Sequence, residues 1–327
     1  MIHPVLGIDV SKETLDVALI DGERLYTKQF ENEPAGYQRL RLWLHKQGIS
    51  KAHVCMEATG QYSDGVAEFL HEQNYEVSVV NPARIKHYAN SKLRRNKTDK
   101  ADAQLIAEYC LREKPALWSP PPVSFKHLQA LIRHLDDLQV NLTRETNRLA
   151  SGVRTPQVLE QLKDLITFLK QQIQQTKAMI QTHINSYPDL KRKQILLTSI
   201  RGIGALTAAK ILGEIRDVTD FENARQLAAY AGLTPRNFLS GTSVHKKSRL
   251  SKAGNSNLRK DLFLPAIVAK RYNLIVKAFC VRLEKSGHRP MEVVGAAMHK
   301  LIHLIFGVLK SGRPFDENYL VNVQTRS

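Results

Sequence analysis

Apolar and polar residues alternate over the first 80 positions in a way that predicts an α/β domain. Short apolar runs predict strands at 5–10, 15–20, 25–30, 53–56 and 76–80. Asp21-Gly22 predicts a hairpin turn between the second and third of these strands. Helical spacing of apolar residues follows Pro34 and recurs at 63–73, so strands and helices alternate after the first three strands. This order predicts a layered domain with a mixed sheet.

Two carboxylates begin the helix that the pattern predicts for 99–111. Asp99 and Asp102 are three residues apart and share one helical face, and Thr98 is placed to cap the helix. Acids in a first turn also suit the helix dipole, which explains most of them without any further function. These two follow a stretch, 77–98, that has no Asp or Glu and suggests a metal site beside a nucleic-acid track. The cations of that stretch are Arg84, Lys86, Lys92, Arg94, Arg95 and Lys97.

Two further acids, Asp9 and Glu57, close predicted strands. An acid at a strand end is usually a solvated turn residue. At one edge of a sheet, however, both can meet Asp99 and Asp102, and four crowded carboxylates repel one another unless cations neutralise them. Two Mg²⁺ ions would do so and suit phosphodiester chemistry, with Mn²⁺ as an alternative.

A proline-rich segment and a leucine repeat follow this domain. The sequence WSPPPV at 118–123 predicts a stiff linker. Leucine and isoleucine recur at helical spacing over 128–149 and 162–184, which predicts two long helices that reverse direction at 150–155. The apolar seam fits a pair within one chain and a contact between two chains equally well. We therefore predict three parts: 1–117, 118–190 and 191–327.

The third part is predicted to be mainly helical, with a glycine turn and a second basic stretch. Gly202 and Gly204 precede a helix at 205–215, as in helix-hairpin-helix DNA binders, although a plain helix turn explains them equally well. Further helices are predicted at 224–231 and from 270 onward. No acid occurs from 223 to 260. The cations there are Arg236, Lys246, Lys247, Arg249, Lys252, Arg259 and Lys260.

Serines are interleaved with these cations. Most of them are best explained as phosphate-binding or turn-capping residues. Ser240 differs because it lies in a Leu-Ser-Gly turn, where glycine permits a sharp backbone and an exposed hydroxyl. A serine that attacks phosphorus needs cations nearby, so Ser240 is a candidate nucleophile. Residues 243–246 also match the SxxK of serine acyl-transfer enzymes, but the accompanying SDN element is absent.

Charge and composition narrow the function further. The formal charge of +17 and the pI near 9.8 favour a polyanionic partner. A basic surface can also bind a membrane or simply keep a protein soluble. Three scattered cysteines are too few for a disulfide framework or a CxxC zinc site. The N-terminus lacks the pattern of a signal peptide, and no run of eighteen apolar residues occurs, so we expect a cytoplasmic, nucleoid-associated protein without a membrane partner.

The motifs GIDVSK, MEATG and NKTDKADA resemble, in order and spacing, the DEDD signature of an RNase H-like, RuvC-type domain. Over nearly its whole length the chain resembles the DEDD transposases of the bridge-RNA-guided insertion-sequence family, relatives of the Piv DNA invertases. The stretches that carry this resemblance include GIDVSKETLDV, CMEATG, RNKTDKADAQLIAEYC, IRGIGALTAA, ARQLAAYAGLTPR, SGTSV and SRLSKAGN. One position departs from the pattern, because Arg201 stands where proline is more usual.

The resemblance implies an α/β RNase H-like N-terminal domain, a helical coiled-coil connector and a mainly α-helical C-terminal transposase domain. It implies that Asp9, Glu57, Asp99 and Asp102 bind the metal and that Ser240 forms a covalent phosphoserine link to DNA. It also implies a noncoding guide (bridge) RNA, target and donor DNA, and a dimer or tetramer in which one subunit's carboxylates meet another's serine.

Three functions remain open at this point. The first is the RNA-guided transposase or recombinase just described. The second is a RuvC-like nuclease or junction resolvase that uses metal-activated water and forms no covalent link. The third is a nucleic-acid binder without catalysis, which uses only the basic surface.

Overall fold

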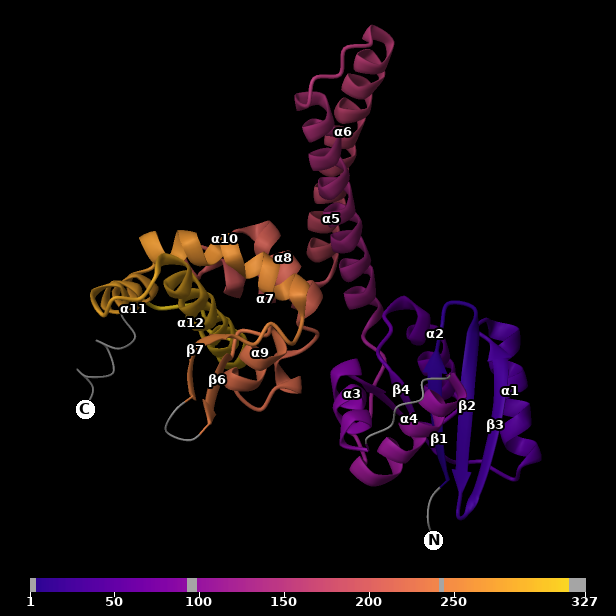
Figure 1. The fold of residues 1–327 in the computed structure, drawn as a ribbon. Coiled ribbons are helices and arrows are strands. Elements are labelled where there is room, and N and C mark those ends of the chain that lie inside the picture. The colour runs from indigo at the N-terminus through magenta and orange to yellow at the C-terminus, as the bar shows by residue number, and fades with distance from the viewer. Residues whose placement is uncertain (1–3, 93–98, 241–243, 318–327) are drawn as a thin grey trace. The chain divides into compact units, whose positions relative to one another are not determined.

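The computed structural model describes residues 4–92, 99–240 and 244–317, with the backbone alone for Gln61, Asp99 and residues 236–249. The chain forms two compact units, Met1–Pro120 and Pro121–Ser327 (Figure 1). The predicted cations Arg94, Arg95 and Lys97 lie outside the described residues.

The first unit is a sheet with helices on both faces. Its strands among the described residues are β1 (Val5–Val10), β2 (Thr14–Asp21), β3 (Arg24–Glu31), β4 (His53–Glu57) and β5 (Glu76–Val80). Its helices there are α1 (Pro34–Lys46), α2 (Gln61–Glu72), α3 (Pro82–Ser91) and α4 (Asp99–Glu113).

The sheet of this unit is mixed, as its sequence predicts. The strand order is β3-β2-β1-β4-β5. The hairpin-connected strands β1, β2 and β3 are antiparallel, whereas β4 and β5, reached through helices, run parallel to β1. This arrangement fits the RNase H-like architecture that the resemblance implies.

Different helices cover the two faces of the sheet. Leu6 of β1 is buried in one cluster with Leu40 of α1 and Leu70 of α2. Side chains alternate along a strand, so the odd-numbered residues of β1 point to the other face. There Val5 packs in a second cluster with Ala103 of α4.

Helix α3 occupies a segment that we interpreted only as a basic run. The side chain of Asn81 accepts a hydrogen bond from the backbone N–H of Ala83, and Pro82 takes the first helical position. Both are signals of a helix start, because an N-cap acceptor and a proline with fixed φ suit the first turn. Asn81-Pro82 therefore ends the strand and begins a helix.

The second unit is mainly helical. Its helices among the described residues are α5 (Val123–Ala150), α6 (Pro156–Ser186), α7 (Pro188–Thr198), α8 (Ala205–Glu214), the 3₁₀ turn η1 (Val218–Asp220), α9 (Ala224–Tyr230), α10 (Ser256–Tyr272), α11 (Leu274–Lys285) and α12 (Pro290–Ser311). Two strands, β6 (Pro235–Ser240) and β7 (Val244–Leu250), form an antiparallel hairpin between α9 and α10.

Helices α5 and α6 are the two long helices that the leucine repeat predicts, and they pack against each other along that seam (Figure 1). We predict that 118–190 forms a separate connector, whereas the structure groups α5 and α6 with the helices that follow them. Helix α5 also packs on α8, and its buried residues share one apolar cluster with the helices that follow. A common core joins residues across such a boundary, so both helices belong to the second compact unit.

Helix α12 lies at the centre of the second unit. Among the described helices it alone is long and apolar enough to cross a membrane by length and composition, and half of its most apolar window is buried in the unit. Val293, Ala297 and Leu301 are fully buried, and the helix packs against α7, α9, α10 and α11. Its apolar character is therefore explained by its place in the core.

Candidate active site

Helix α4 lies directly on the strand that ends with Asp9. A Cβ atom added to Gly7 would be 2.3 Å from the carbonyl oxygen of Ala103 and 2.3 Å from the backbone nitrogen of Ala107. Only glycine permits so close an approach of helix to strand. Asp9 is two residues further along β1, so its side chain points to the same face as the glycine. The half-buried Asp9 thus stands on the α4 side of the sheet.

The strand register aligns Asp9 with acids on both neighbouring strands. Ile8 pairs with Met56 in parallel, which puts Glu57 level with Asp9 on β4. Asp16 of β2 is the direct antiparallel partner of Asp9. Side chains of directly paired residues share one face, so three carboxylates lie in one row across β2, β1 and β4.

Asp16 was not among the residues that sequence reasoning singled out. It is 5% exposed, and its Oδ2 accepts a hydrogen bond from Nε2 of Gln29, its partner on β3, at 2.9 Å. The available signal was the alternation of β2 itself, in which an acid interrupts apolar residues at a position facing away from Leu15 and Val17. A buried strand seldom carries such an acid unless it has a partner.

Helix α4 runs so that its first turn reaches the end of this row. Near its C-terminus, Sγ of Cys110 lies 3.8 Å from the carbonyl oxygen of His53, at the start of β4. Ala103, two turns earlier, lies over Gly7, which is further along the sheet. One more turn back comes Asp99, at the level where β1 and β4 end. The helix therefore brings its first turn towards Asp9 and Glu57.

The two acids of that turn lie on buried stripes of α4. Asp102 precedes the buried Ile106 by four residues, and Asp99 precedes Ala103 by four. Asp102 is half-buried, whereas the side chain of Asp99 lies outside the described part of the structure. Asp9, Glu57 and Asp102 each already take part in an interaction.

Carboxylate oxygens are the donors that Mg²⁺ prefers, so the chemistry of the row and of the helix start fits a divalent metal. Among the side chains that the structure describes, no group of three or more His, Cys, Asp or Glu residues could hold a metal ion. That search does not reach the side chain of Asp99, which begins α4. Metal binding by Asp9, Glu57, Asp99 and Asp102 therefore stays a prediction.

Two buried thiols lie between helix α4 and the sheet. Cys55, between Gly7 and Ser78 in the sheet, and Cys110 of α4 are both fully buried in one cluster. The hydrogen bond between the thiols lowers the pKa of Cys110 to about 6, against the effect of burial, with a smaller contribution from His53. The same hydrogen bond and burial raise the pKa of Cys55. These thiols belong to the apolar cluster between α4 and the face of the sheet that carries the acids.

The first set of predicted cations lies partly on α3. Arg84 and Lys86 are exposed on this helix, which packs beside α4. Lys92, at the end of α3, places its Nζ 5.6 Å from the centroid of the Tyr88 ring. Three cations of the predicted track therefore lie in the same unit as the row of acids.

Ser240 is the last residue of β6, where it pairs with Val244 of β7. Residues 241–243, which join the two strands, lie outside the described residues. We expected a serine turn in a mainly helical region and did not predict the strands around it. Basic and serine residues have low strand propensity, so only the pairing of β6 with β7 reveals the hairpin. Of the predicted cations, Arg236, Lys246, Lys247 and Arg249 are on these strands, and their side chains lie outside the described part.

Three other predicted cations lie where the hairpin joins the helices. Lys252 is exposed, and its backbone N–H donates to the carbonyl oxygen of Gly232. Arg259 donates from Nη1 to the carbonyl oxygen of Ala231 at 3.0 Å. Lys260 is exposed and forms an ion pair with Asp136. Arg259 and Lys260 thus already serve the fold in addition to any role towards nucleic acid.

The glycine turn lies between α7 and α8, as predicted, but its two glycines differ. Gly202 has a φ of +109°, and an added Cβ would be 2.9 Å from the carbonyl oxygen of Pro265 in α10. Gly204 is exposed at the N-cap of α8 with open space around it. The close packing against α10 explains why residue 202 is a glycine, whereas Gly204 has open space in which a ligand could approach it.

Two family descriptions match the chain. Residues 6–158 match a family described as Transposase, and residues 194–280 match the Transposase IS116/IS110/IS902 family. The chain is 36% identical over 321 residues to the pilin gene-inverting protein of Moraxella bovis, with 95% of this chain and 97% of the relative covered. The pilin gene-inverting protein of Moraxella lacunata has the same identity and coverage.

One more distant relative is also a transposase. The transposase for insertion sequence element IS1111A of Coxiella burnetii is 26% identical over 288 residues, which cover 78% of this chain and 74% of the relative. The solved structure of T. thermophilus RuvC in complex with Holliday junction substrate matches 35% of this chain and 98% of that chain, at 16% identity. Its TM-score of 0.27 is too low to define the fold. The relatives that match over most of their length show that the chain belongs to the IS116/IS110/IS902 family of transposases.

Proposed function

We propose that this transposase cuts and rejoins DNA through a covalent bond between Ser240 and a DNA phosphate, with divalent metal ions held by Asp9, Glu57, Asp99 and Asp102. The observation that carries the proposal is that Asp9 and Glu57 are level on neighbouring parallel strands, at the end of the sheet that the first turn of α4 approaches. The pilin gene-inverting relatives support DNA inversion as a related outcome of the same chemistry.

The proposed reaction is a transesterification. The hydroxyl of Ser240 loses its proton as Oγ forms a bond to phosphorus, and one phosphorus–oxygen ester bond of the DNA breaks. The released DNA oxygen takes up a proton and leaves as a hydroxyl. A hydroxyl of another DNA end then attacks the phosphoserine, which rejoins DNA and returns the serine. The number of phosphoester bonds is conserved, so rejoining needs no external energy source.

The chain's own residues supply the surroundings of this reaction. The basic residues of the β6–β7 hairpin would hold the DNA backbone and stabilise charge on the phosphoryl oxygens. The four carboxylates would hold the metal, which, when bound, supplies further charge stabilisation at phosphorus and favours the deprotonated serine. We extend the proposal to a noncoding guide RNA and to a dimer or tetramer in which the carboxylates of one subunit act with Ser240 of another. Both extensions are supported by the family resemblance, and the charge of +17 suits two nucleic acids at once.

A denaturing gel tests the covalent step. The full chain is incubated with Mg²⁺, its DNA sites and the noncoding RNA that flanks its gene, and then denatured. We expect a slowly migrating protein–DNA band that is lost in Ser240→Ala and in Asp102→Asn but kept in the matched control Ser251→Ala. If RNase treatment before the addition of DNA leaves the band unchanged, the guide RNA is not required. If the wild type forms no such band under any of these conditions, the phosphoserine mechanism is wrong.

A second function is favoured by one observation, which is that all four acid positions belong to a single compact unit with its own core. Such a unit could act as a RuvC-like nuclease that uses water as its nucleophile. Strand cleavage that survives Ser240→Ala but not Asp102→Asn would support this alternative. DNA binding with no strand chemistry in the wild type would leave only the non-catalytic binder.

A further inference from the structure

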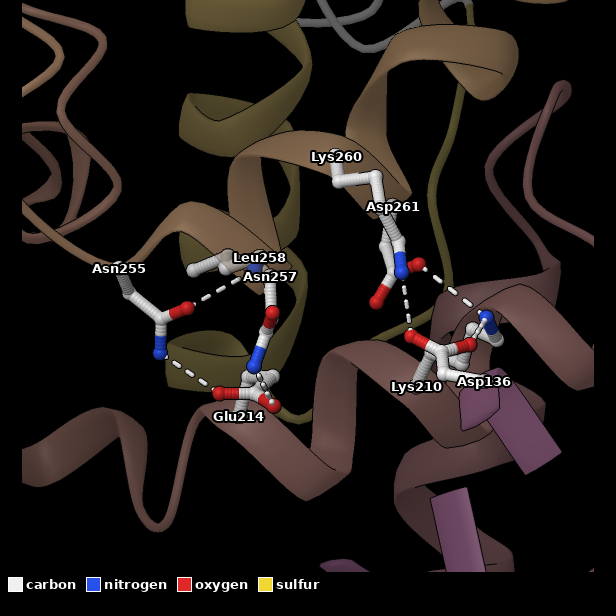
Figure 2. A network of polar contacts seen from close by, with 8 residues as sticks. All are labelled: Asp136, Lys210, Glu214, Asn255, Asn257, Leu258, Lys260 and Asp261. Atoms are coloured by element: carbon white, nitrogen blue, oxygen red, sulfur yellow. Dashed lines mark hydrogen bonds and ion pairs between the residues drawn. The ribbon is translucent and has the colours of Figure 1, made fainter. Parts of the chain in front are cut away.

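Glu214, the last residue of α8, is a buried carboxylate with 4% of its surface exposed. Its Oε2 accepts a hydrogen bond from Nδ2 of Asn255 at 2.6 Å, and its Oε1 accepts a longer one from Nδ2 of Asn257 at 3.4 Å (Figure 2). The neighbouring Asp136 is paired with lysines instead. Burying a carboxylate is costly unless it is well bonded, so the two amide donors matter for the fold around them.

Asn255 connects this carboxylate to two other elements. Its Oδ1 accepts from the backbone N–H of Leu258 at 2.9 Å and so caps α10. Its backbone N–H donates to the carbonyl oxygen of Tyr230, at the end of α9, at 2.6 Å. The hydroxyl of Tyr230 in turn donates to the backbone oxygen of Glu214 at 3.2 Å. Glu214, Tyr230 and Asn255 therefore join the ends of α8 and α9 to the start of α10.

Both ends of the β6–β7 hairpin emerge from this junction. The chain leaves α9 just before β6 and returns from β7 just before α10. The two flanking segments run side by side, since the N–H of Ser251 donates to the carbonyl oxygen of Thr234 and that of Lys252 donates to Gly232. Gly254 has a φ of +141°, and an added Cβ would be 2.3 Å from the oxygen of Tyr230. The base of the hairpin is thus held tightly against the helices.

We propose that Glu214 is a positioning residue for Ser240. Through Asn255 it fixes the base of the hairpin, and the hairpin carries the serine at the end of β6. A nucleophile must be held within a fraction of an ångström of its attack geometry, so loosening the base slows the reaction even when DNA still binds. The proposal rests on the function proposed for Ser240.

The chemistry of the contact explains why glutamate is needed. A carboxylate presents two acceptors, which match the two amide donors of Asn255 and Asn257. Glutamine would present one acceptor and one donor, and the donor would face an N–H group. If Asn255 is replaced by aspartate in the Glu214→Gln variant, the new carboxylate can accept a hydrogen bond from the new amide, and a donor–acceptor pair is restored. Aspartate also keeps the N-cap of α10.

The test is a cycle of three variants assayed for the rate of serine–DNA adduct formation and for DNA affinity. We expect Glu214→Gln and Asn255→Asp each to slow adduct formation about 10-fold or more, the effect of losing one hydrogen bond to a charged group. The double variant Glu214→Gln/Asn255→Asp should recover the rate to within about 3-fold of wild type, because the two changes are coupled. DNA affinity should change little in all three. Glu284→Gln, which breaks the Lys270–Glu284 ion pair between α10 and α11, is the matched control and should leave the rate unchanged.

Hydrogen–deuterium exchange supplies a readout that does not depend on activity. In Glu214→Gln, amides of 235–255 should exchange faster while those of α12 and of the first unit keep their wild-type rates, and the double variant should reverse the change. Equal acceleration throughout the second unit, an unchanged adduct rate in both single variants, or an impaired rate without rescue would each overturn the proposal. If the wild type forms no serine adduct, the proposed function fails, whereas the exchange data still decide whether Glu214 fixes the hairpin.

Discussion

Asp16 and Asp9 are direct partners on the antiparallel strands β2 and β1, with their side chains on the face that α4 covers. Like charges directly opposite each other in a sheet repel. Gln29 donates a hydrogen bond to Asp16, which holds that carboxylate beside the acids expected to bind metal. The pair therefore adds a negative charge that favours a cation at this end of the sheet.

Asp16→Asn should relieve this repulsion and weaken the response to metal. The hydrogen bond with Gln29 can persist, so we expect the metal-free protein to gain about 0.2–1 kcal/mol of stability. The increase in melting temperature on adding Mg²⁺ should be smaller than in wild type, because less negative charge favours the ion. Thermal melts in EDTA and in Mg²⁺ measure both effects. Asp21→Asn, at the other end of β2 opposite Arg24, is the control, and equal behaviour of the two variants would refute the expectation.

Gly7→Ala should destabilise the first unit. The added methyl would lie 2.3 Å from the backbone of α4 at Ala103 and Ala107, so the helix would have to move away from the sheet. We expect a loss of about 1–3 kcal/mol in urea unfolding, together with loss of strand chemistry. Gly307→Ala makes the same chemical change in α12 with open space around it and should stabilise by about 0.5–1 kcal/mol. A neutral Gly7→Ala would mean that α4 does not lie on β1 as described.

Gly202→Ala and Gly204→Ala should have different effects. Gly202 has a positive φ and touches α10. Its substitution should reduce the free energy of unfolding by about 1–3 kcal/mol and therefore lower the melting temperature. Gly204 has room for a methyl group, so its substitution should leave stability nearly unchanged and act on nucleic-acid affinity alone. Melting curves and filter-binding assays on both variants separate packing from contact. Equal melting temperatures would contradict the packing role of Gly202.

Lys246→Ala and Arg249→Ala, on β7, should each weaken DNA binding. Each phosphate contact releases about one counterion, so the slope of log affinity against log salt should become shallower by about 1 unit per variant. Affinities measured across a salt series test this. Lys277→Ala on α11 removes the same charge elsewhere in the unit and serves as the control. An unchanged slope in both hairpin variants would place the DNA track on another surface.

Asp136→Asn should reduce stability in a pH-dependent way. Burial alone would raise the pKa of Asp136, but its contacts with Lys210 and Lys260 outweigh burial and lower that pKa. A lowered carboxyl pKa gives stability above the ordinary Asp pKa, about 4, which is lost as the pH falls through the folded-state pKa. The variant should therefore be less stable by about 1–3 kcal/mol at pH 7, and this difference should shrink in acid.

Urea unfolding of both proteins from pH 7 down to pH 3 measures this difference. Asp137→Asn, the exposed neighbour on α5, should differ little from wild type at any pH. A gap between wild type and Asp136→Asn that stays constant with pH would show that the ion pairs with the lysines are not its source.

The local elements of this protein follow from patterns within short stretches of its chain. Short apolar runs and Asp21-Gly22 predicted the strands of the first unit, and leucine spacing predicted the two long helices. Asp9 and Glu57 became candidates because each lies at the end of a buried strand, and Asp99 and Asp102 because a helix begins there. Such signals depend on residues only a few positions apart, where propensity and periodicity act.

Contacts between residues far apart in the chain depend instead on how its segments pack. Strand register put Asp16 beside Asp9, and pairing alone revealed the hairpin that carries Ser240. The burial of Glu214 beneath Asn255 likewise joins positions 41 residues apart. These relationships follow from pairing and close packing between separate segments, which depend on the whole core, and a sequence pattern within one segment does not contain them.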